Sequence, residues 1–267
     1  MPELAAELPP AEQPQESMPA MSFLEHLEEL RHRIIYALIA VGIGFFACWA
    51  YAEHIYEIIQ RPVIEALKHN GIPEKLGYLN PTEPFNLYLK TAFLAGLFVA
   101  SPFVLYQVWM FISPGLYRRE KRYVLPFMFS TIFLFLGGGY FGYKIVFPAA
   151  LDFLIGYGRQ FQPMITVGEY TDLFLTVILG LGLVFELPIL VFFLSLMGVI
   201  SAGWMWRNVR YSILVIFIIA AVLTPTTDIL NMCIFAAPMV ALYLVSILVA
   251  WLVHPTRRRL RQTRKEQ

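Results

Sequence analysis

Three glutamates stand where a carboxylate could hold a positively charged group. Glu29 precedes the first long apolar run, and Glu120 is the single acid within the basic stretch 118–122. A carboxylate accepts both N–H bonds of a planar guanidinium, so either glutamate is a candidate arginine-binding group. Two simpler interpretations stay open from the residues alone. Glu29 could form a local ion pair with Arg33, worth about 0.2–0.5 kcal/mol, and Glu120 could merely balance charge.

The third glutamate, Glu186, is the one charged residue in the apolar run 173–196. Placing an acid at the centre of a membrane helix costs several kcal/mol, about 2.5–3.5 kcal/mol for aspartate, and such residues are usually functional. A packed acid that hydrogen-bonds to a serine, threonine or glutamine of another helix is the simpler alternative.

Catalytic and metal-binding patterns are absent from the sequence. Glu28, Glu29 and Arg33 fit the EExxxR pattern of intramembrane prenyl-protein proteases, but those enzymes also need histidines within later spans. The five histidines all lie outside the middle of any apolar run: His26, His32, His54, His69 and His254. HExxH, GxSxG and P-loop patterns do not occur either. The two cysteines, Cys48 and Cys233, lie in apolar runs and are typical of small buried hydrophobic residues. We therefore predict no enzyme activity, no metal and no cofactor.

These side chains must be positioned by membrane-spanning helices. The chain of 267 residues is 58% hydrophobic and only 15% charged, whereas soluble domains carry about 25% charged residues. A bilayer core requires roughly 20 apolar residues per helix. Runs of this kind occupy 34–52, 87–112, 123–147, 173–196 and 230–253, and a shorter run occupies 211–223. The sequence predicts an all-α, polytopic membrane protein with six transmembrane helices.

The distribution of Lys and Arg predicts the orientation of these helices. Fourteen basic residues lie on the side that holds both termini and six on the other side. Because basic residues near helix ends stay in the cytoplasm, we expect both termini to be cytoplasmic. Residues 1–20 are rich in Pro, Ala and Glu and are expected to form a disordered cytoplasmic tail; 21–253 form the membrane domain, and 254–267 form a basic cytoplasmic tail.

Local signals predict details of the helices. The Ser22–Glu25 pair has the form of a capping box, and the helix that it starts should lie along the membrane surface before entering the first span. That helix has an apolar stripe that includes Leu27 and Ile34. Outside the membrane, Pro62 should interrupt a helical segment between 56 and 68. The glycines at 137–139 should allow close helix contact in the third span.

Several of these motifs together resemble the TatC family, the large subunit of the twin-arginine translocase. The similar segments run in family order: 22–31, 81–85, 101–109, 113–122, 185–188 and 223–228. They cover the chain from about Ser22 to Val253, and six spans accompany them. The combination is specific, although each motif alone would be weak.

The resemblance implies a receptor in the bacterial inner membrane that binds signal peptides with two adjacent arginines. With single-span partners of the TatA and TatB type it would form an oligomeric complex that exports folded proteins on the protonmotive force. Glu29 and Glu120 would hold the arginines. The remaining implied positions are Arg31, Leu116, Phe111 and Gln107 for the signal peptide, Glu186 for a partner's helix, and Pro62 and Asp228 as external structural residues. No nucleic acid is expected as a partner.

Two other classes of protein compete with this interpretation. A proton-coupled secondary transporter of a small solute could use Glu186 as its proton carrier, but it should also show internal symmetry and several buried polar groups. An intramembrane protease would need the missing histidines. The sequence therefore favours the receptor.

Overall fold

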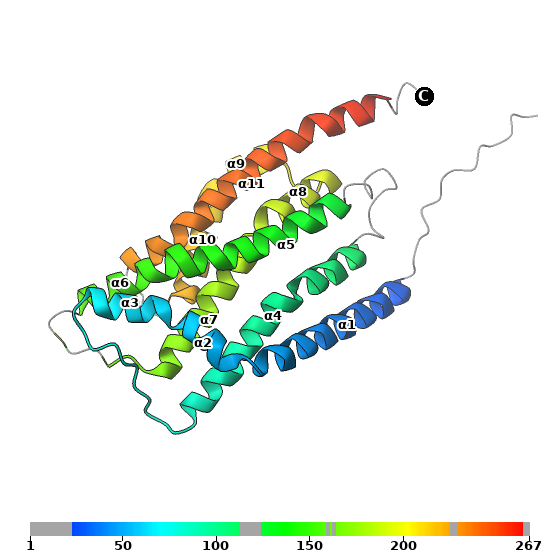
Figure 1. Ribbon diagram of the computed structural model, residues 1–267. Helices are drawn as coiled ribbons and strands as arrows, with labels where there is room; N and C mark the ends of the chain where they lie inside the picture. The colour runs from blue at the N-terminus through cyan, green and yellow to red at the C-terminus, as the bar shows by residue number, and fades with distance from the viewer. Residues whose placement is uncertain (1–22, 113–123, 159–160, 162–163, 225–228, 264–267) are drawn as a thin grey trace, which may run out of the picture.

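The computed structural model describes residues 23–112, 124–158, 161, 164–224 and 229–263, which form a bundle of helices (Figure 1). The elements are α1 (Phe23–Trp49), α2 (Ala52–Ile59), α3 (Arg61–His69), α4 (Glu83–Ile112), α5 (Val124–Phe141), the π-helix η3 (Gly142–Val146), α6 (Phe147–Tyr157), α7 (Val167–Val184), α8 (Leu187–Met197), α9 (Ala202–Arg207), α10 (Val209–Leu223) and α11 (Ile229–Thr263).

The expected spans are confirmed. Within the described ranges, five helical segments are long and apolar enough to cross a bilayer, at 24–49, 83–112, 126–157, 167–197 and 232–252, and α10 adds a shorter one. The third span is continuous through α5, η3 and α6, and the fourth consists of α7 and α8. The start of α1 and the end of α11 lie at the same end of the bundle, as six spans require (Figure 1).

The first helix differs from expectation in one respect. Phe23–Trp49 forms one uninterrupted helix of 27 residues, so its first turns continue the axis of the span instead of lying across it. Within α1, no proline or glycine precedes Gly42 to allow a bend. The apolar stripe is on the outer side of α1, where Leu27 and Ile34 are exposed, whereas Glu29 is partly buried.

α1 and α4 run side by side in opposite directions (Figure 1). Gly44 and Gly96 face each other where the two helices meet. A Cβ atom on Gly44 would lie 2.6 Å from the carbonyl oxygen of Gly96, and one on Gly96 would lie 2.5 Å from the backbone nitrogen of Phe45. Two backbones approach this closely only where side chains are absent.

The glycines expected to permit close packing in the third span do so at two of three positions. A Cβ atom on Gly138 would lie 2.8 Å from the carbonyl oxygen of Leu181, and one on Gly139 would lie 2.4 Å from the ring of Phe98. Gly137 has no neighbour within 4 Å. Glycine therefore brings α5 against both α4 and α7.

At the opposite end of the bundle from Glu29, α2 and α3 cover the helix ends. Pro62 is buried in the first turn of α3, where a missing N–H costs nothing, and the segment breaks into two helices as expected. The hydroxyl of Tyr170 donates to the carbonyl of Ile59 (2.6 Å), and that of Tyr143 donates to the carbonyl of Ile58 (2.8 Å). Tyr170 thereby supplies a donor to the last carbonyl of α2, and Tyr143 adds one to the Ile58 carbonyl, which also accepts a backbone N–H at the helix end.

Candidate functional site

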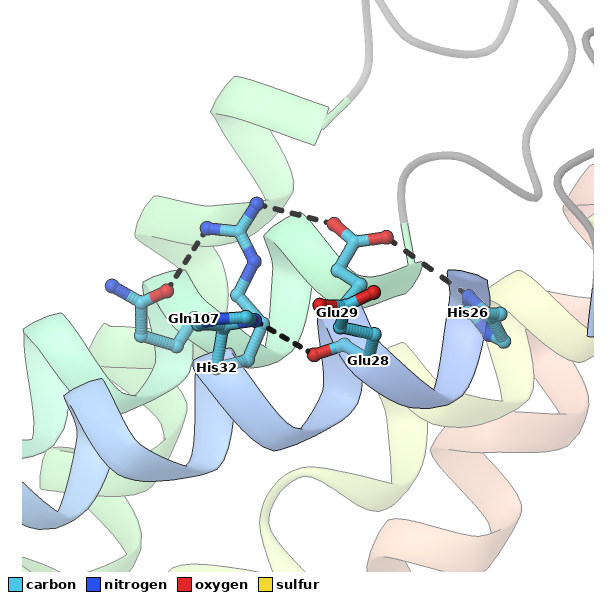
Figure 2. Close-up of polar contacts among 6 residues, drawn as sticks. His26, Glu28, Glu29, His32 and Gln107 are labelled. Carbon is cyan, nitrogen blue, oxygen red and sulfur yellow. Dashed lines mark hydrogen bonds and ion pairs between the residues drawn. The ribbon is translucent and has the colours of Figure 1, made fainter. Parts of the chain in front are cut away.

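A polar cluster joins α1 to α4 near the end of the bundle where α1 begins. Arg33 is its centre. Its Nη2 donates to Oε1 of Glu29 (3.2 Å), one turn earlier on α1, and its Nη1 donates to Oε1 of Gln107 on α4 (3.1 Å) (Figure 2). One guanidinium therefore bridges a carboxylate and an amide on two helices.

The sequence forms this cluster through helical spacing and burial. Residues four apart lie on the same face of a helix, which brings Glu29 and Arg33 together. Gln107 is only 5% exposed, and a buried amide oxygen requires a donor. Arg33 supplies that donor. On α4, Trp109 donates its Nε1–H to Oγ1 of Thr131 (3.0 Å), which holds this part of the helix against α5.

The second carboxylate oxygen of Glu29, Oε2, differs from the first in its environment. Oε2 is buried, and no residue that the structure describes lies within hydrogen-bond distance of it. Nδ1 of His26 lies 4.0 Å from it (Figure 2). A buried carboxylate oxygen without a donor is costly, so this atom is suited to accept an N–H from a ligand.

An aromatic contact borders the cluster. The ring of His26 stacks on the ring of Phe111, with centroids 4.4 Å apart and planes 12° apart. Such a surface can pack against an apolar or guanidinium plane of a bound peptide. His26, Glu29 and Arg33 follow at steps of three and four on one face of α1, and this spacing was the available signal for His26, which the sequence-based site omitted.

The structure brings together three of the six residues expected at the signal-peptide site: Glu29, Gln107 and Phe111. Arg31 is not in the cluster; it is exposed and lies about 200° around the helix from Glu29. Leu116 and Glu120 lie outside the described residues, so their proximity to Glu29 stays a prediction. Asp228 is also outside the described residues.

Glu186 lies at an interruption of the fourth span. It connects α7 to α8, where Pro188 lacks the N–H that would continue the helix. The side chain is half-buried, and its Oε1 atom has no hydrogen-bond partner among the described residues. The simpler expectation, a bond to serine, threonine or glutamine on a neighbouring helix, therefore finds no support at this oxygen.

A second polar region lies at the other end of the bundle. A cavity of about 260 Å³ between the starts of α4 and α7 is lined by residues that include Glu83, Lys90 and Asp172. Lys90 pairs with Asp172, and Oε1 of Glu83 accepts the backbone N–H of Asn80 (3.2 Å). These groups stabilise the start of α4. Over the described part of the chain, no group of three or more His, Cys, Asp or Glu residues could hold a metal ion.

Known proteins resemble this chain over most of its length. The family model described as "Sec-independent protein translocase protein (TatC)" matches residues 25–238. The chain is 69% identical over 252 residues to the protein of that name from Koribacter versatilis (strain Ellin345), covering 94% of this chain and 93% of the relative. It is 40% identical over 229 residues to the protein of the same name from Desulforapulum autotrophicum, covering 85% of this chain and 83% of the relative.

A solved structure has the same fold. The crystal structure titled "Twin Arginine Translocase Receptor- TatC" superimposes with a TM-score of 0.77 at 35% sequence identity, covering 86% of this chain and all of that chain. These matches exclude the secondary transporter and the protease as alternatives. The chain belongs to the TatC family of Sec-independent protein translocase proteins, the receptor subunits of the twin-arginine translocase.

Proposed function

We propose that the Glu29 face of α1, together with Gln107 and Phe111 of α4, is the surface that binds the arginine pair of a signal peptide. The observation that carries this proposal is the state of the Glu29 carboxylate. One of its oxygens already accepts a guanidinium N–H, and the other is buried with no donor among the described residues. The site is therefore shaped for guanidinium and can accept another N–H.

Arginine suits this site better than lysine does. A guanidinium presents two parallel N–H groups that a carboxylate accepts together, whereas an ammonium group is a compact point charge. The aromatic surface of His26 and Phe111 adds a plane on which a guanidinium can stack. A signal peptide with two lysines should therefore bind more weakly than one with two arginines.

Glu120 is proposed as the carboxylate for the second arginine, with Leu116 beside it. Support comes from the sequence, in which Glu120 is the lone acid among four basic residues that would repel a cationic peptide. It acts on the peptide only if it is held toward Glu29. We assign Arg31 a place at the edge of the site, since it is exposed on another side of α1.

The test compares two neighbouring carboxylates. Labelled synthetic signal peptides are titrated against the purified protein in lipid nanodiscs, with Glu29→Gln as the variant and Glu28→Gln as its matched control. Glu28 has the same charge but is exposed, so its loss should leave affinity nearly unchanged. Loss of a hydrogen bond between charged groups costs about 1.5–3 kcal/mol, so Glu29→Gln should weaken binding roughly tenfold to hundredfold. Undiminished binding in a Glu29→Gln, Glu120→Gln double variant rules this site out.

We further propose that Glu186 docks the transmembrane helix of a single-span partner. Support comes from its position at the interruption of the fourth span and from its Oε1 atom, which no described residue satisfies. A polar group on a partner helix could provide the missing bond. Crosslinking from positions flanking Glu186 should capture a single-span subunit, and Glu186→Ala should reduce that capture. Unchanged assembly and export in Glu186→Ala would leave only a packing role.

The end of the bundle that holds Glu29 is proposed to face the cytoplasm of a bacterium, in the inner membrane. Support comes from the excess of basic residues on that side, fourteen against six. From there, the protein with its single-span partners would export folded precursors on the protonmotive force. In a cysteine-free background, Tyr78→Cys in the exposed segment before α4 should react with a membrane-impermeant thiol reagent added to intact cells. Reaction only after cell lysis would reverse this orientation.

A further inference from the structure

Arg33 occupies the carboxylate that the proposed function reserves for the signal peptide. We propose that Arg33 is a built-in competitor: its guanidinium holds Glu29 in the unliganded receptor, and a signal arginine must displace it to bind. This inference rests on the proposed function, because it assumes that Glu29 binds the peptide. It adds a residue that controls affinity without contacting the ligand in the final complex.

The geometry allows such an exchange. The side chains of Arg33 and Glu29 are 23% and 18% exposed, so the pair lies at the edge of the protein, where an incoming group can reach it. Arg33 uses different nitrogens for its two partners, Nη2 for Glu29 and Nη1 for Gln107. It can therefore release Glu29 and keep its bond to Gln107, so the buried amide is not left without a donor.

The second oxygen of Glu29 provides the entry step. Oε2 is buried and has no donor among the described residues, so the Glu29 side chain must first turn this oxygen toward the incoming arginine. The new bond can then form while Arg33 still holds Oε1. Displacement of Arg33 then frees Oε1 and completes the two-bond contact between the carboxylate and the new guanidinium. At no stage does the carboxylate lose all of its donors.

Competition of this kind has a defined thermodynamic signature. When a site is available only part of the time, the apparent dissociation constant of every ligand rises by the same factor. Partly exposed ion pairs of this type shift an equilibrium by about 1.5-fold to fivefold. Removing Arg33 should therefore tighten twin-arginine and twin-lysine peptides by one common factor in this range, and the ratio of their affinities should stay the same.

The experiment uses Arg33→Gln and Arg33→Met, two neutral replacements of similar length, each alone and combined with Glu29→Gln. The full-length protein is titrated in nanodiscs with the same twin-arginine and twin-lysine peptides. In the protein that retains Glu29, either replacement of Arg33 should lower the dissociation constants of both peptides by the same factor, about 1.5-fold to fivefold. In the Glu29→Gln background the replacement should have a smaller effect, because only the long-range loss of one positive charge remains.

The outcomes separate the two proposals. Weaker binding on removal of Arg33 would mean that this residue positions Glu29, and the competitor role would be overturned. Equal tightening with and without Glu29 would mean that bulk charge is responsible, which also overturns it. If Glu29→Gln itself leaves affinity unchanged, the proposed site fails, whatever Arg33 does. If one replacement does not fold, the other gives the same comparison.

Discussion

Substitution of Gly44 by alanine is a quantitative test of the close contact between α1 and α4. Alanine at position 44 would place its Cβ atom 2.6 Å from a carbonyl oxygen of the other helix, where ordinary contact begins at 3.4 Å. The two backbones would have to separate locally by about 0.8 Å, because neither can rotate out of the way. Overpacking of this kind typically costs about 1–3 kcal/mol.

Gly42 is the matched control for this substitution. It lies two residues earlier on the same helix, and a Cβ atom there would have no neighbour within 4 Å. In water, alanine stabilises a helix by about 0.8–1.0 kcal/mol relative to glycine. Gly42→Ala should therefore leave the free energy of unfolding unchanged or raise it, and the increase should be smaller in lipid than in water. The difference between Gly44→Ala and Gly42→Ala therefore isolates the steric term.

The assay is reversible unfolding of the purified protein in mixed micelles, followed by tryptophan fluorescence as denaturing detergent is added. Gly44→Ala should lower the free energy of unfolding by about 1–3 kcal/mol relative to Gly42→Ala. It should also weaken signal-peptide binding, since Glu29 and Gln107 belong to the two helices that are pushed apart. Equal stability of the two alanine variants would refute the close backbone contact.

Two further predictions concern the helices outside the membrane. Tyr170→Phe removes the buried bond to the carbonyl of Ile59 and should lower the free energy of unfolding by about 1–3 kcal/mol in the same assay. Tyr143→Phe removes an exposed bond and should lower it by less. An equal effect of the two substitutions would contradict the difference in burial. Burial, with a smaller contribution from Tyr88, raises the pKa of Tyr56 to about 12 from its ordinary value of 10.0. The folded state thus keeps this proton longer than the unfolded state, so stability should fall as the pH rises from about 10 to about 12, and Tyr56→Phe should reduce that fall in a pH series of unfolding measurements.

The sequence predicted the fold well because the bilayer imposes a simple rule. A helix must be predominantly apolar over about 20 residues to span the membrane, and that property is visible without knowledge of its neighbours. The break before Pro62 was equally local, since proline lacks the N–H that a continuing helix needs. Both features depend on residues close together in the chain, and both are found in the structure.

Pairings between helices could not be read in the same way. The bridge from Arg33 to Gln107 joins residues 74 positions apart, and Gly44 and Gly96 are also far apart in the chain. Neither has a periodic signal. The sequence predicted the pair of Glu29 and Arg33 as one alternative, and it predicted Gln107 as a neighbour of the site. It did not predict that the Arg33 guanidinium bonds to both of the other residues. The π-helix at Gly142–Val146 was missed for a related reason, as nothing in its composition separates it from an α-helix.

The local ion pair of Glu29 with Arg33 does not conflict with the proposed role of Glu29 in signal binding. A free carboxylate at the edge of a membrane would be strongly hydrated, and a cationic peptide would have to remove that water before it could bind. Arg33 already replaces water at Oε1 and holds the carboxylate in a position in which it accepts an N–H from a guanidinium. Exchange of one guanidinium for another keeps the carboxylate paired, so the free energy of exchange depends on the shape of the incoming group and on the bond that it adds at Oε2. On the proposed function, a receptor that releases each precursor benefits from a carboxylate that is already paired, because displacing Arg33 offsets part of the affinity for the incoming arginine.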